Sequence, residues 1–423
     1  MKPRIDDCRT HFDALVQAAL AGADPARSVR EALQGRSIGA GAVIAVGKAA
    51  PAMFDGFVAA AGEPMEWFMI VPKGIKAPSW AIRGDHPLPT ARNVEAARAL
   101  AAFIERVKRG AGPETRFVFL LSGGASALLT LPLEPIGLDE YRSLTARLLH
   151  AGADIHQLNC VRKHAERLKG GRLAAMMAPV GVENLVLSDV IGDDLSVIGS
   201  GPLAPDPTTI RDALDVLDRF GIGAGVVREV LEGGARGGST ETPKPGDSVF
   251  DRVSSRVVGN NALAVDAAAS AAVRLGFRVL EARSGVTGEA SELGRTLASR
   301  LAQLPEDTPS VIVLGGETTV RVGDAGGRGG PCTELVLAGA IEIANQSGIA
   351  IGAFATDGVD GPTDAAGAWA TPATCGAARS AGLDPAKSLK EHDSLGFFER
   401  AGGLIRTGPT GTNVNDVMVG IRY

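Results

Sequence analysis

Two glycine-containing loops carry groups that can bind phosphate. Lys48 follows Gly47 directly after the apolar stretch 42–46, and a lysine there brings an ammonium to the start of a helix, where phosphate or carboxylate binds well. The second loop follows the apolar stretch 117–121, and it consists of Ser122, Gly123, Gly124, Ala125 and Ser126. Its small residues expose backbone N–H groups, and its serines add two hydroxyls. We interpret both loops as phosphate-binding; the alternatives are a solvated surface lysine and a plain tight turn.

Acidic residues are concentrated in two further loops. Residues 188–194 follow the apolar stretch 185–187 and contain Asp189, Asp193 and Asp194. Residues 355–364 carry three aspartates between glycines, among them Asp357, but they lack the bidentate glutamate and the flanking helices of an EF-hand. Carboxylates in such loops can hold Mg²⁺ or accept a proton from a hydroxyl. Asp194 is equally a candidate helix N-cap.

An arginine inside a run of glycines indicates phosphoryl transfer. Arg328 lies within residues 326–330, of which the other four are all glycine, and a helical pattern follows. A guanidinium on such a loop can neutralise charge on a phosphoryl group in flight; a disordered loop with an incidental arginine is the alternative. Glu317 follows the apolar stretch 311–314, and Asn413 and Asp416 precede the last one. These side chains suit a polar ligand or a turn.

Composition and spacing exclude several other classes. The 43 basic and 48 acidic residues give a net charge of −5, and aromatic residues make up 4% of the chain, which argues against nucleic-acid binding. Charges interrupt the first twenty residues, and no apolar run is long enough for a membrane span, so we expect a cytoplasmic protein. The four cysteines and six histidines show no metal-ligand spacing, and no GxSxG motif occurs. His86, next to Asp85, is the one histidine that we expect to contact a substrate.

Apolar stretches alternate with alanine-rich helical patterns along almost the whole chain. This alternation predicts an α/β fold with mostly parallel sheets covered by helices on both faces. Ligands bind outside the carboxyl ends of such strands, where the loops described above lie.

The length of 423 residues favours two domains. Residues 233–246 are rich in glycine, proline and threonine and lack periodicity, so we interpret them as a linker between domains of residues 1–240 and 241–423. The first thirty residues have a helical pattern that can pack on either domain.

Eight segments together resemble the glycerate 2-kinase family, whose C-terminal half is called the MOFRL domain and whose members are often named hydroxypyruvate reductase. In order they are VGKAAPAM, GDHPLPTARN, LLSGGASALL, LNCVRKHAERLKGGRLA, LSDVIGDDLSVIGSGPLAPDPTT, GGETTVRV, ATDGVDGPTDAAGA and GTNVNDVMV. The resemblance implies transfer of the γ-phosphoryl group of ATP to the 2-hydroxyl of D-glycerate with Mg²⁺. It also implies a Rossmann-like first domain, a MOFRL-type second domain and an active-site cleft between them.

The resemblance also implies roles for particular residues. Lys48 and Arg328 would be the catalytic cations. From the residues alone, the base should be a carboxylate within hydrogen-bond reach of the hydroxyl, and Asp189 is our first candidate, ahead of Asp357. Asp189 and Asp193 would hold the metal. The nucleotide and its phosphates would contact Ser122, Gly123, Gly124, Ala125, Ser126, Asn260 and Glu317, and the substrate would contact His86, Asp357, Asn413 and Asp416. One departure is that Pro331-Cys332 stands where the family usually has Arg-Asn.

Two other functions remain open from the residues alone. A hydroxypyruvate reductase that uses NAD(P)H would need a GxGxxG motif after its first strand, but this chain has Gly-Lys-Ala-Ala-Pro there. A sugar-acid binding protein without catalysis would not need the arginine in its glycine loop. The expected partners are small molecules, neither nucleic acid nor membrane, and the oligomeric state stays open, with a homodimer as one option.

Overall fold

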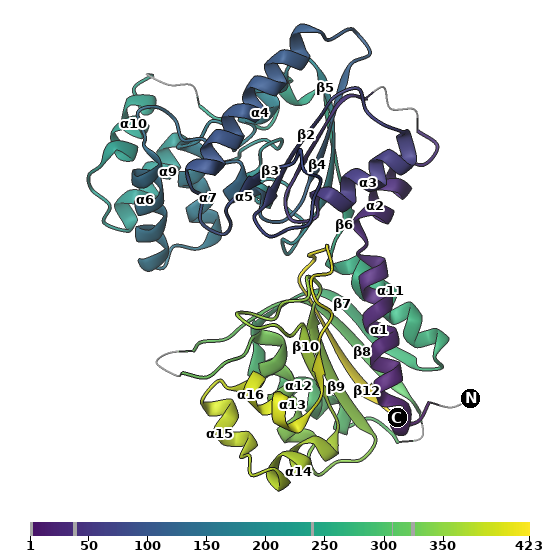
Figure 1. Cartoon of the computed structure of the whole chain (residues 1–423). Coiled ribbons are helices and arrows are strands. Elements are labelled where there is room, and N and C mark those ends of the chain that lie inside the picture. Colours follow the sequence, from purple (N-terminus) through teal and green to yellow (C-terminus); the bar gives the residue numbers. More distant parts are fainter. Residues whose placement is uncertain (1–2, 37–39, 238–240, 307, 323–325) are drawn as a thin grey trace. The chain divides into compact units, whose positions relative to one another are not determined.

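The computed structural model describes residues 3–36, 40–237, 241–306, 308–322 and 326–423, which divide into two compact units (Figure 1). The first unit runs from Pro25 to Val258. The second unit combines the described residues up to Asp24 with Gly259–Tyr423. Each unit contains a six-stranded sheet and helices, so the predicted α/β class is confirmed.

The first unit contains the parallel sheet that the sequence predicts. Its strand order is β3-β2-β1-β4-β5-β6, and β1 pairs in parallel with both β2 and β4. The strands are β1 (Ala40–Val46), β2 (Trp67–Pro72), β3 (Ile82–Gly84), β4 (Arg116–Leu121), β5 (Gly181–Leu187) and β6 (Val253–Gly259). The chain places β2 and β3 on one side of β1, and β4 on the other. The order therefore reverses between β1 and β4, and ligands bind at such switch points in open α/β sheets.

Apolar side chains on both faces explain why β4 and β5 are central strands. Phe117 and Phe119 of β4 are fully buried, and they share one core with Leu100 and Ile104 of α4. Each such aromatic side chain contributes on the order of 1.5–3 kcal/mol through its burial. Besides four helices that share a separate core, the first unit contains α2 (Pro25–Leu33), α3 (Ala50–Ala61), α4 (Ala91–Arg109), α5 (Ala125–Leu128) and α8 (Arg172–Met177), with 3₁₀ turns η2 (Ile198–Ser200) and η3 (Ser248–Phe250).

Four further helices of the first unit share a separate apolar core, which includes Leu148, Leu158 and Leu217. They are α6 (Leu138–His150), α7 (Ile155–His164), α9 (Ile210–Arg219) and α10 (Val226–Ala235). The glycine pair Gly170-Gly171 separates α7 from α8, and both glycines have left-handed backbone angles, with φ of 56° and 79°.

The segment interpreted as a linker packs within the first unit where the structure describes it. The buried Thr242 hydroxyl donates to Asp206 at 3.0 Å, and the Asp206 N–H donates to the Pro243 carbonyl at 2.9 Å. β6, which follows, joins the first sheet. The boundary between the two compact units therefore lies between residues 258 and 259, whereas the sequence pattern predicts a division after residue 240.

The second unit has a mixed sheet, which differs from the predicted, mostly parallel one. Its strand order is β11-β10-β9-β12-β8-β7. Among the described residues of this second sheet, only β7 and β8 pair in parallel. The C-terminal strand β12 lies between β8 and β9 and runs antiparallel to both. The strands are β7 (Arg278–Glu289), β8 (Ser310–Thr319), β9 (Ile349–Ala355), β10 (Gly367–Ala370), β11 (Leu404–Ile405) and β12 (Asp416–Arg422).

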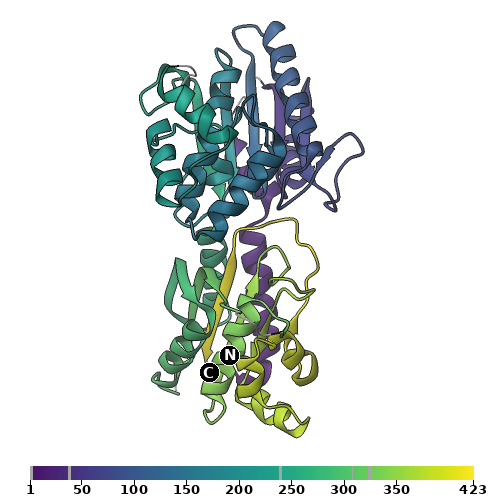
Figure 2. The ribbon, with the colours of Figure 1, turned by 90° about the vertical axis from the view of Figure 1, so that its left-hand side faces the viewer.

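The N-terminal helix α1 (Cys8–Gly22) belongs to the second unit, beside the last strands of the chain (Figures 1 and 2). Its Phe12 ring lies against Gly352 of β9, where a Cβ atom would be 2.3 Å from the ring. The 3₁₀ turn η1 (Ile5–Asp7) precedes α1. The other helices of this unit are α11 (Asn261–Arg274), α12 (Ala290–Ala302), α13 (Pro331–Ile343), α14 (Pro372–Ser380), α15 (Pro385–Lys390) and α16 (Ser394–Ala401).

Candidate active site

The loops after β1 and β4 interlock at the switch point of the first sheet. Val46 and Leu121, the last residues of the two strands, are paired, and the Ser122 N–H donates to the Val46 carbonyl at 3.0 Å. The Lys48 N–H donates to the Gly123 carbonyl at 2.9 Å. Gly47 is required here, because its φ is 124° and a Cβ atom would lie 2.2 Å from the Ser122 hydroxyl oxygen.

The Ser122 hydroxyl joins the two loops to each other. It accepts a hydrogen bond from the Ala49 N–H at 3.1 Å and donates one to the Val46 carbonyl at 3.3 Å. A hydroxyl has one proton, so this side chain holds the loops together and has no second proton for a phosphate. Ser122 therefore lies where the sequence analysis expects it, but its hydroxyl is already engaged.

Lys48 and His86 approach the same glycine of the second loop. A Cβ atom at Gly124 would lie 3.2 Å from His86 Cδ2 and 3.7 Å from Lys48 Cγ, and the φ of Gly124 is 87°. Reduced hydration lowers the pKa of His86, and the nearby Lys48 ammonium lowers it further. His86 is therefore neutral at physiological pH, and Lys48 supplies the positive charge at this corner.

Asp189 reaches the same loop from the next strand. It follows β5, which pairs with β4 through Val186 and Leu121, and a Cβ atom at Gly123 would lie 2.2 Å from Asp189 Oδ2. The structure thus brings together Lys48, His86, Asp189 and the glycines of the loop, as the sequence analysis expects.

Asp193 lies in a turn four residues after Asp189. Its φ is 55°, and its N–H donates to the Val190 carbonyl at 3.1 Å. No group of three or more His, Cys, Asp or Glu suited to a metal ion occurs among the residues that the structure describes. Carboxylates at Asp189 and Asp193 still fit Mg²⁺, since this ion usually takes one or two carboxylates together with substrate phosphates.

In the second unit, three predicted carboxylates gather at the start of β12. Asp416 pairs with Gly316 of β8 and Ala355 of β9, so Glu317 and Asp357 follow within two residues on the neighbouring strands. Burial raises the pKa of Asp416 well above its usual value, and the carboxylates of Asp360, Glu317 and Asp357 raise it further. Asp416 therefore keeps its proton at higher pH than an ordinary aspartate.

Asp360, another aspartate of the loop after β9, has a structural role. Its two buried oxygens accept the Cys332 N–H at 2.9 Å and the Thr333 N–H at 2.8 Å, at the start of α13. Asp360 is therefore committed to the first turn of this helix, whose N–H groups lack intrahelical acceptors.

The departure at Pro331-Cys332 lies in the same turn. Pro331 opens α13, a position where proline is well tolerated. The Cys332 thiol is buried against the carboxylates of Asp416 and Asp360, and burial raises its pKa well above the ordinary value. The arginine that the resemblance leads us to expect at position 331 is absent, and Arg328 as its replacement stays a prediction.

Two asparagines of the predicted set take part in local hydrogen bonds. Asn260 caps α11, where its side-chain oxygen accepts the Leu263 N–H at 3.1 Å. The Asn413 side chain accepts the Asn415 N–H at 3.2 Å in the turn before β12. Both contacts are ordinary capping and turn chemistry, and ligand contacts at Asn260 and Asn413 stay predictions.

Arg328 is paired with a carboxylate. Its Nη2 donates to Glu399 of α16 at 2.9 Å, its backbone N–H donates to Asp393 at 3.2 Å, and 63% of its side chain is exposed. The glycines around it are needed for close packing, because a Cβ atom at Gly327 would lie 2.1 Å from the Glu391 carbonyl oxygen. An exposed pair of this kind is weak, so a stronger anion can replace Glu399.

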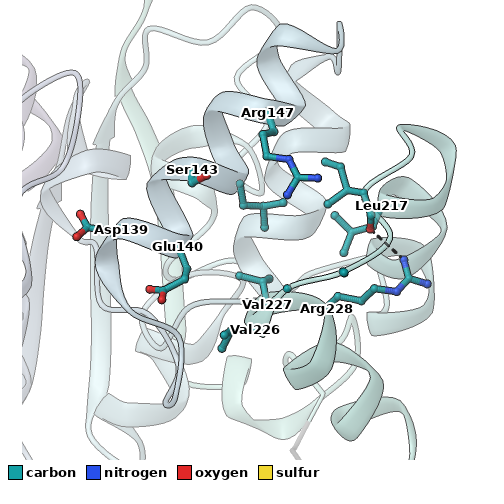
Figure 3. A pocket seen from close by; sticks show the side chains of 12 residues that line it. Asp139, Glu140, Ser143, Arg147, Leu217, Val226, Val227 and Arg228 are labelled. Carbon is teal, nitrogen blue, oxygen red and sulfur yellow. Dashed lines mark hydrogen bonds between the residues drawn. The ribbon is translucent and has the colours of Figure 1, made fainter.

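A separate pocket in the helical layer holds none of the predicted residues (Figure 3). It lies between α6, α9 and α10 and is lined mainly by apolar side chains such as Leu144 and Leu217, with Arg147 and Arg228 at its edge.

No helix among the described residues meets the length and hydropathy that a membrane span requires.

The fold and the first-unit site together define an α/β protein with a glycine loop, a lysine and a carboxylate at the switch point of its first sheet. Comparison with known families agrees. Residues 11–232 match the model of a domain of unknown function, DUF4147, and residues 310–416 match the MOFRL family.

Individual relatives specify the family. The glycerate 2-kinase of Pyrococcus horikoshii is 36% identical, with 96% of each chain covered. A provisionally named hydroxypyruvate reductase of Agrobacterium vitis is 39% identical over 95% of this chain and 92% of its own. The crystal structure of a glycerate kinase from Thermotoga maritima has a TM-score of 0.90 at 34% identity and covers 99% of this chain and 100% of its own. The chain belongs to the glycerate 2-kinase family.

Proposed function

We propose that this protein is a D-glycerate 2-kinase, which transfers the γ-phosphoryl group of ATP to the 2-hydroxyl of D-glycerate and yields 2-phosphoglycerate and ADP. The observation that carries this proposal is the convergence of Lys48, the Ser122–Ser126 loop and Asp189 at the switch point of the first sheet. Relatives named as glycerate kinases support the choice of reaction. The substrates are small molecules, and we place the reaction in the cytoplasm; a homodimer stays a prediction.

The transfer needs positive charge and orientation more than covalent catalysis. Lys48 stabilises the charge on the phosphoryl oxygens, and the glycine loop supports the phosphates through backbone N–H groups. Arg328 exchanges Glu399 for the transferring group and supplies the second cation. Asp189 and Asp193 would hold Mg²⁺, which would neutralise further phosphate charge.

The acceptor hydroxyl loses its proton in the same step. The 2-hydroxyl oxygen forms the new bond to the γ-phosphorus, the bond to the β–γ bridging oxygen breaks, and ADP leaves. Asp189 is the first candidate to accept the proton and Asp357 the second, since a carboxylate can act as a general base. The raised pKa of Asp416 favours its protonated form, which can donate a hydrogen bond to the glycerate, and His86 and Asn413 are the other proposed substrate contacts.

The test is a comparison of two assays on the same preparation. ADP release from ATP and D-glycerate, measured with a coupled enzyme, is expected to be fast and to depend on both substrates. NADH oxidation with hydroxypyruvate is expected to be at background, because the turn after β1 carries Lys48 where a dinucleotide site needs further glycines. Rapid NADH oxidation without ADP release would show a reductase instead, and binding of glycerate without either activity would show a binding protein.

A further inference from the structure

Helix α7 places a further cation, Arg162, at the loop of residues 122–126. Arg162, in the last turn of α7, donates from Nη2 to the Ser126 hydroxyl at 2.6 Å and from Nε to the Tyr141 hydroxyl at 3.0 Å. Within the part of the chain that the structure describes, no hydrogen bond is formed by the remaining nitrogen, Nη1. Arg162 is partly exposed, and Nη1 is the nitrogen that these two contacts leave for a ligand.

The Ser126 hydroxyl has no proton left for a phosphate. Ser200 Oγ donates to Asn159 Oδ1 at 2.9 Å and lies 2.8 Å from Ser126 Oγ. Since Ser200 gives its single proton to Asn159, Ser126 must donate to Ser200 and accept from Arg162. Ser126 therefore orients the guanidinium and does not itself donate to a phosphate.

The other anchor of Arg162 is rigid. Tyr141 is buried in the core of the helical layer, and burial raises the pKa of its phenol well above the ordinary value, so the hydroxyl stays protonated. Near it, Glu166 and Lys169 form a fully buried ion pair at 2.7 Å, and Glu166 also accepts the Leu131 N–H at 2.7 Å. A buried ion pair contributes little net stability, which fits a role in fixing geometry.

We infer that Arg162 binds the phosphates of the nucleotide through Nη1, as a second cation beside the loop that Lys48 approaches from the Gly124 side. Ser126 and Tyr141 are positioning residues for its guanidinium. This inference rests on the proposed kinase function. It extends that function, because the sequence analysis assigns no role to Arg162 or Tyr141 and does not give Ser126 the role of positioning a cation. A planar guanidinium anchored at two corners suits phosphate oxygens better than a mobile lysine does.

The test is calorimetric titration of the full chain with ATP and, separately, with adenosine. Arg162→Gln is expected to weaken ATP binding by about 10- to 100-fold, the effect of losing one charge-assisted hydrogen bond, and to leave adenosine binding unchanged. Arg167→Gln, which removes an exposed arginine five residues further on, is the matched control and should bind ATP like the wild type. Tyr141→Phe keeps the guanidinium but removes one anchor, and it should weaken ATP binding by a smaller factor.

Three results would overturn the inference and leave the kinase proposal standing. Unchanged ATP affinity in Arg162→Gln would remove Arg162 from the site. Equal weakening for ATP and adenosine would show a structural role. If Arg162→Gln does not fold, Tyr141→Phe decides, and wild-type ATP affinity in that variant would contradict the inference. Absence of ATP binding in the wild type would overturn the kinase proposal as well, so the two failures are distinguishable.

Discussion

Lys48 and Arg328 are the side chains on which the proposed chemistry depends most. Each brings one positive charge to the phosphoryl group, and loss of one such group commonly lowers kcat by about 10²- to 10⁵-fold. We expect Lys48→Ala and Arg328→Ala each to lower kcat by about 10³-fold in the ADP-release assay, with unchanged thermal unfolding. Near-normal turnover in either variant would remove that residue from the mechanism.

The ion partner of Arg328 provides the control. Glu399→Gln breaks the exposed Arg328–Glu399 pair, which is worth at most about 1 kcal/mol. Because Arg328 must leave Glu399 to reach a phosphate, we expect turnover to stay within about threefold of the wild type, on the scale of that weak pair. A loss as large as that of Arg328→Ala would mean that the pair itself is the functional unit.

The buried pair of Lys163 and Asp206 governs stability rather than catalysis. The two groups are 3.3 Å apart and at most 5% exposed. Burial alone would raise the pKa of Asp206, but the Lys163 ammonium and the Thr208 hydrogen bond hold it below the ordinary value of 3.8. We expect Asp206→Asn to lower the free energy of unfolding in urea by about 3–5 kcal/mol at neutral pH, because it leaves a buried ammonium unpaired.

This effect has a defined pH dependence. A carboxylate whose pKa is lower in the folded state contributes its stability above the ordinary pKa and loses it as pH falls through the lower folded value. The difference between Asp206→Asn and the wild type should therefore shrink below about pH 4, near the ordinary pKa of an aspartate. Asp215→Asn, on an exposed pair with Arg211, should change stability by less than about 1 kcal/mol, and an equal effect at both sites would contradict this account.

At the scale of elements, the turn after β1 determines how closely β1 and β4 end together. Gly47→Ala would place a Cβ atom 2.2 Å from the Ser122 hydroxyl and 2.5 Å from its carbonyl oxygen, at a φ of 124°. We expect a loss of about 3 kcal/mol in urea unfolding, from overpacking and backbone strain together. Gly62→Ala, at a φ of 82° with no atom within 4 Å, carries the strain alone and should lose about 1 kcal/mol. Equal losses at the two positions would show that the contact with Ser122 is unimportant.

The sequence predicts β1, β4 and β5 of the first unit well, because each of these strands is a short apolar run followed directly by glycine or serine. It does not predict strand direction in the second unit, since nothing in the local pattern of β12 shows that this strand inserts antiparallel between β8 and β9. The helical pattern of α1 shows one apolar face but not the unit against which that face packs. Similarly, glycine and threonine in residues 233–246 suggest a linker, although Thr242 is held by a distant aspartate.

The same limit applies to the site. Residue types and positions after strands are enough to predict Lys48, the glycine loop and Asp189. They do not show that the Ser122 and Ser126 hydroxyls are already engaged, because the partners of Ser126 lie 36 and 74 residues away. Arg162 lies in the segment LNCVRKHAERLKGGRLA, and its signal in the sequence is the run of basic residues Arg162, Lys163 and His164 after an apolar stretch.

At the scale of the whole molecule, the family match extends over both units, and the likeness to a glycerate kinase structure covers nearly the entire chain. Family membership accounts for the fold. The roles of individual residues are proposals that rest on the geometry within each unit, and the predicted cleft between the domains stays a prediction. A test of the whole protein must therefore identify the product that it forms.

The most direct test is proton-coupled ³¹P nuclear magnetic resonance of the product formed from ATP and D-glycerate. Phosphate on the 2-hydroxyl couples to the single proton on C2, so we predict a doublet that appears together with ADP. Phosphate on the 3-hydroxyl would couple to two methylene protons and split further. A split signal of that second kind, or no new phosphorus signal at all while ATP persists, would contradict the proposal of a D-glycerate 2-kinase.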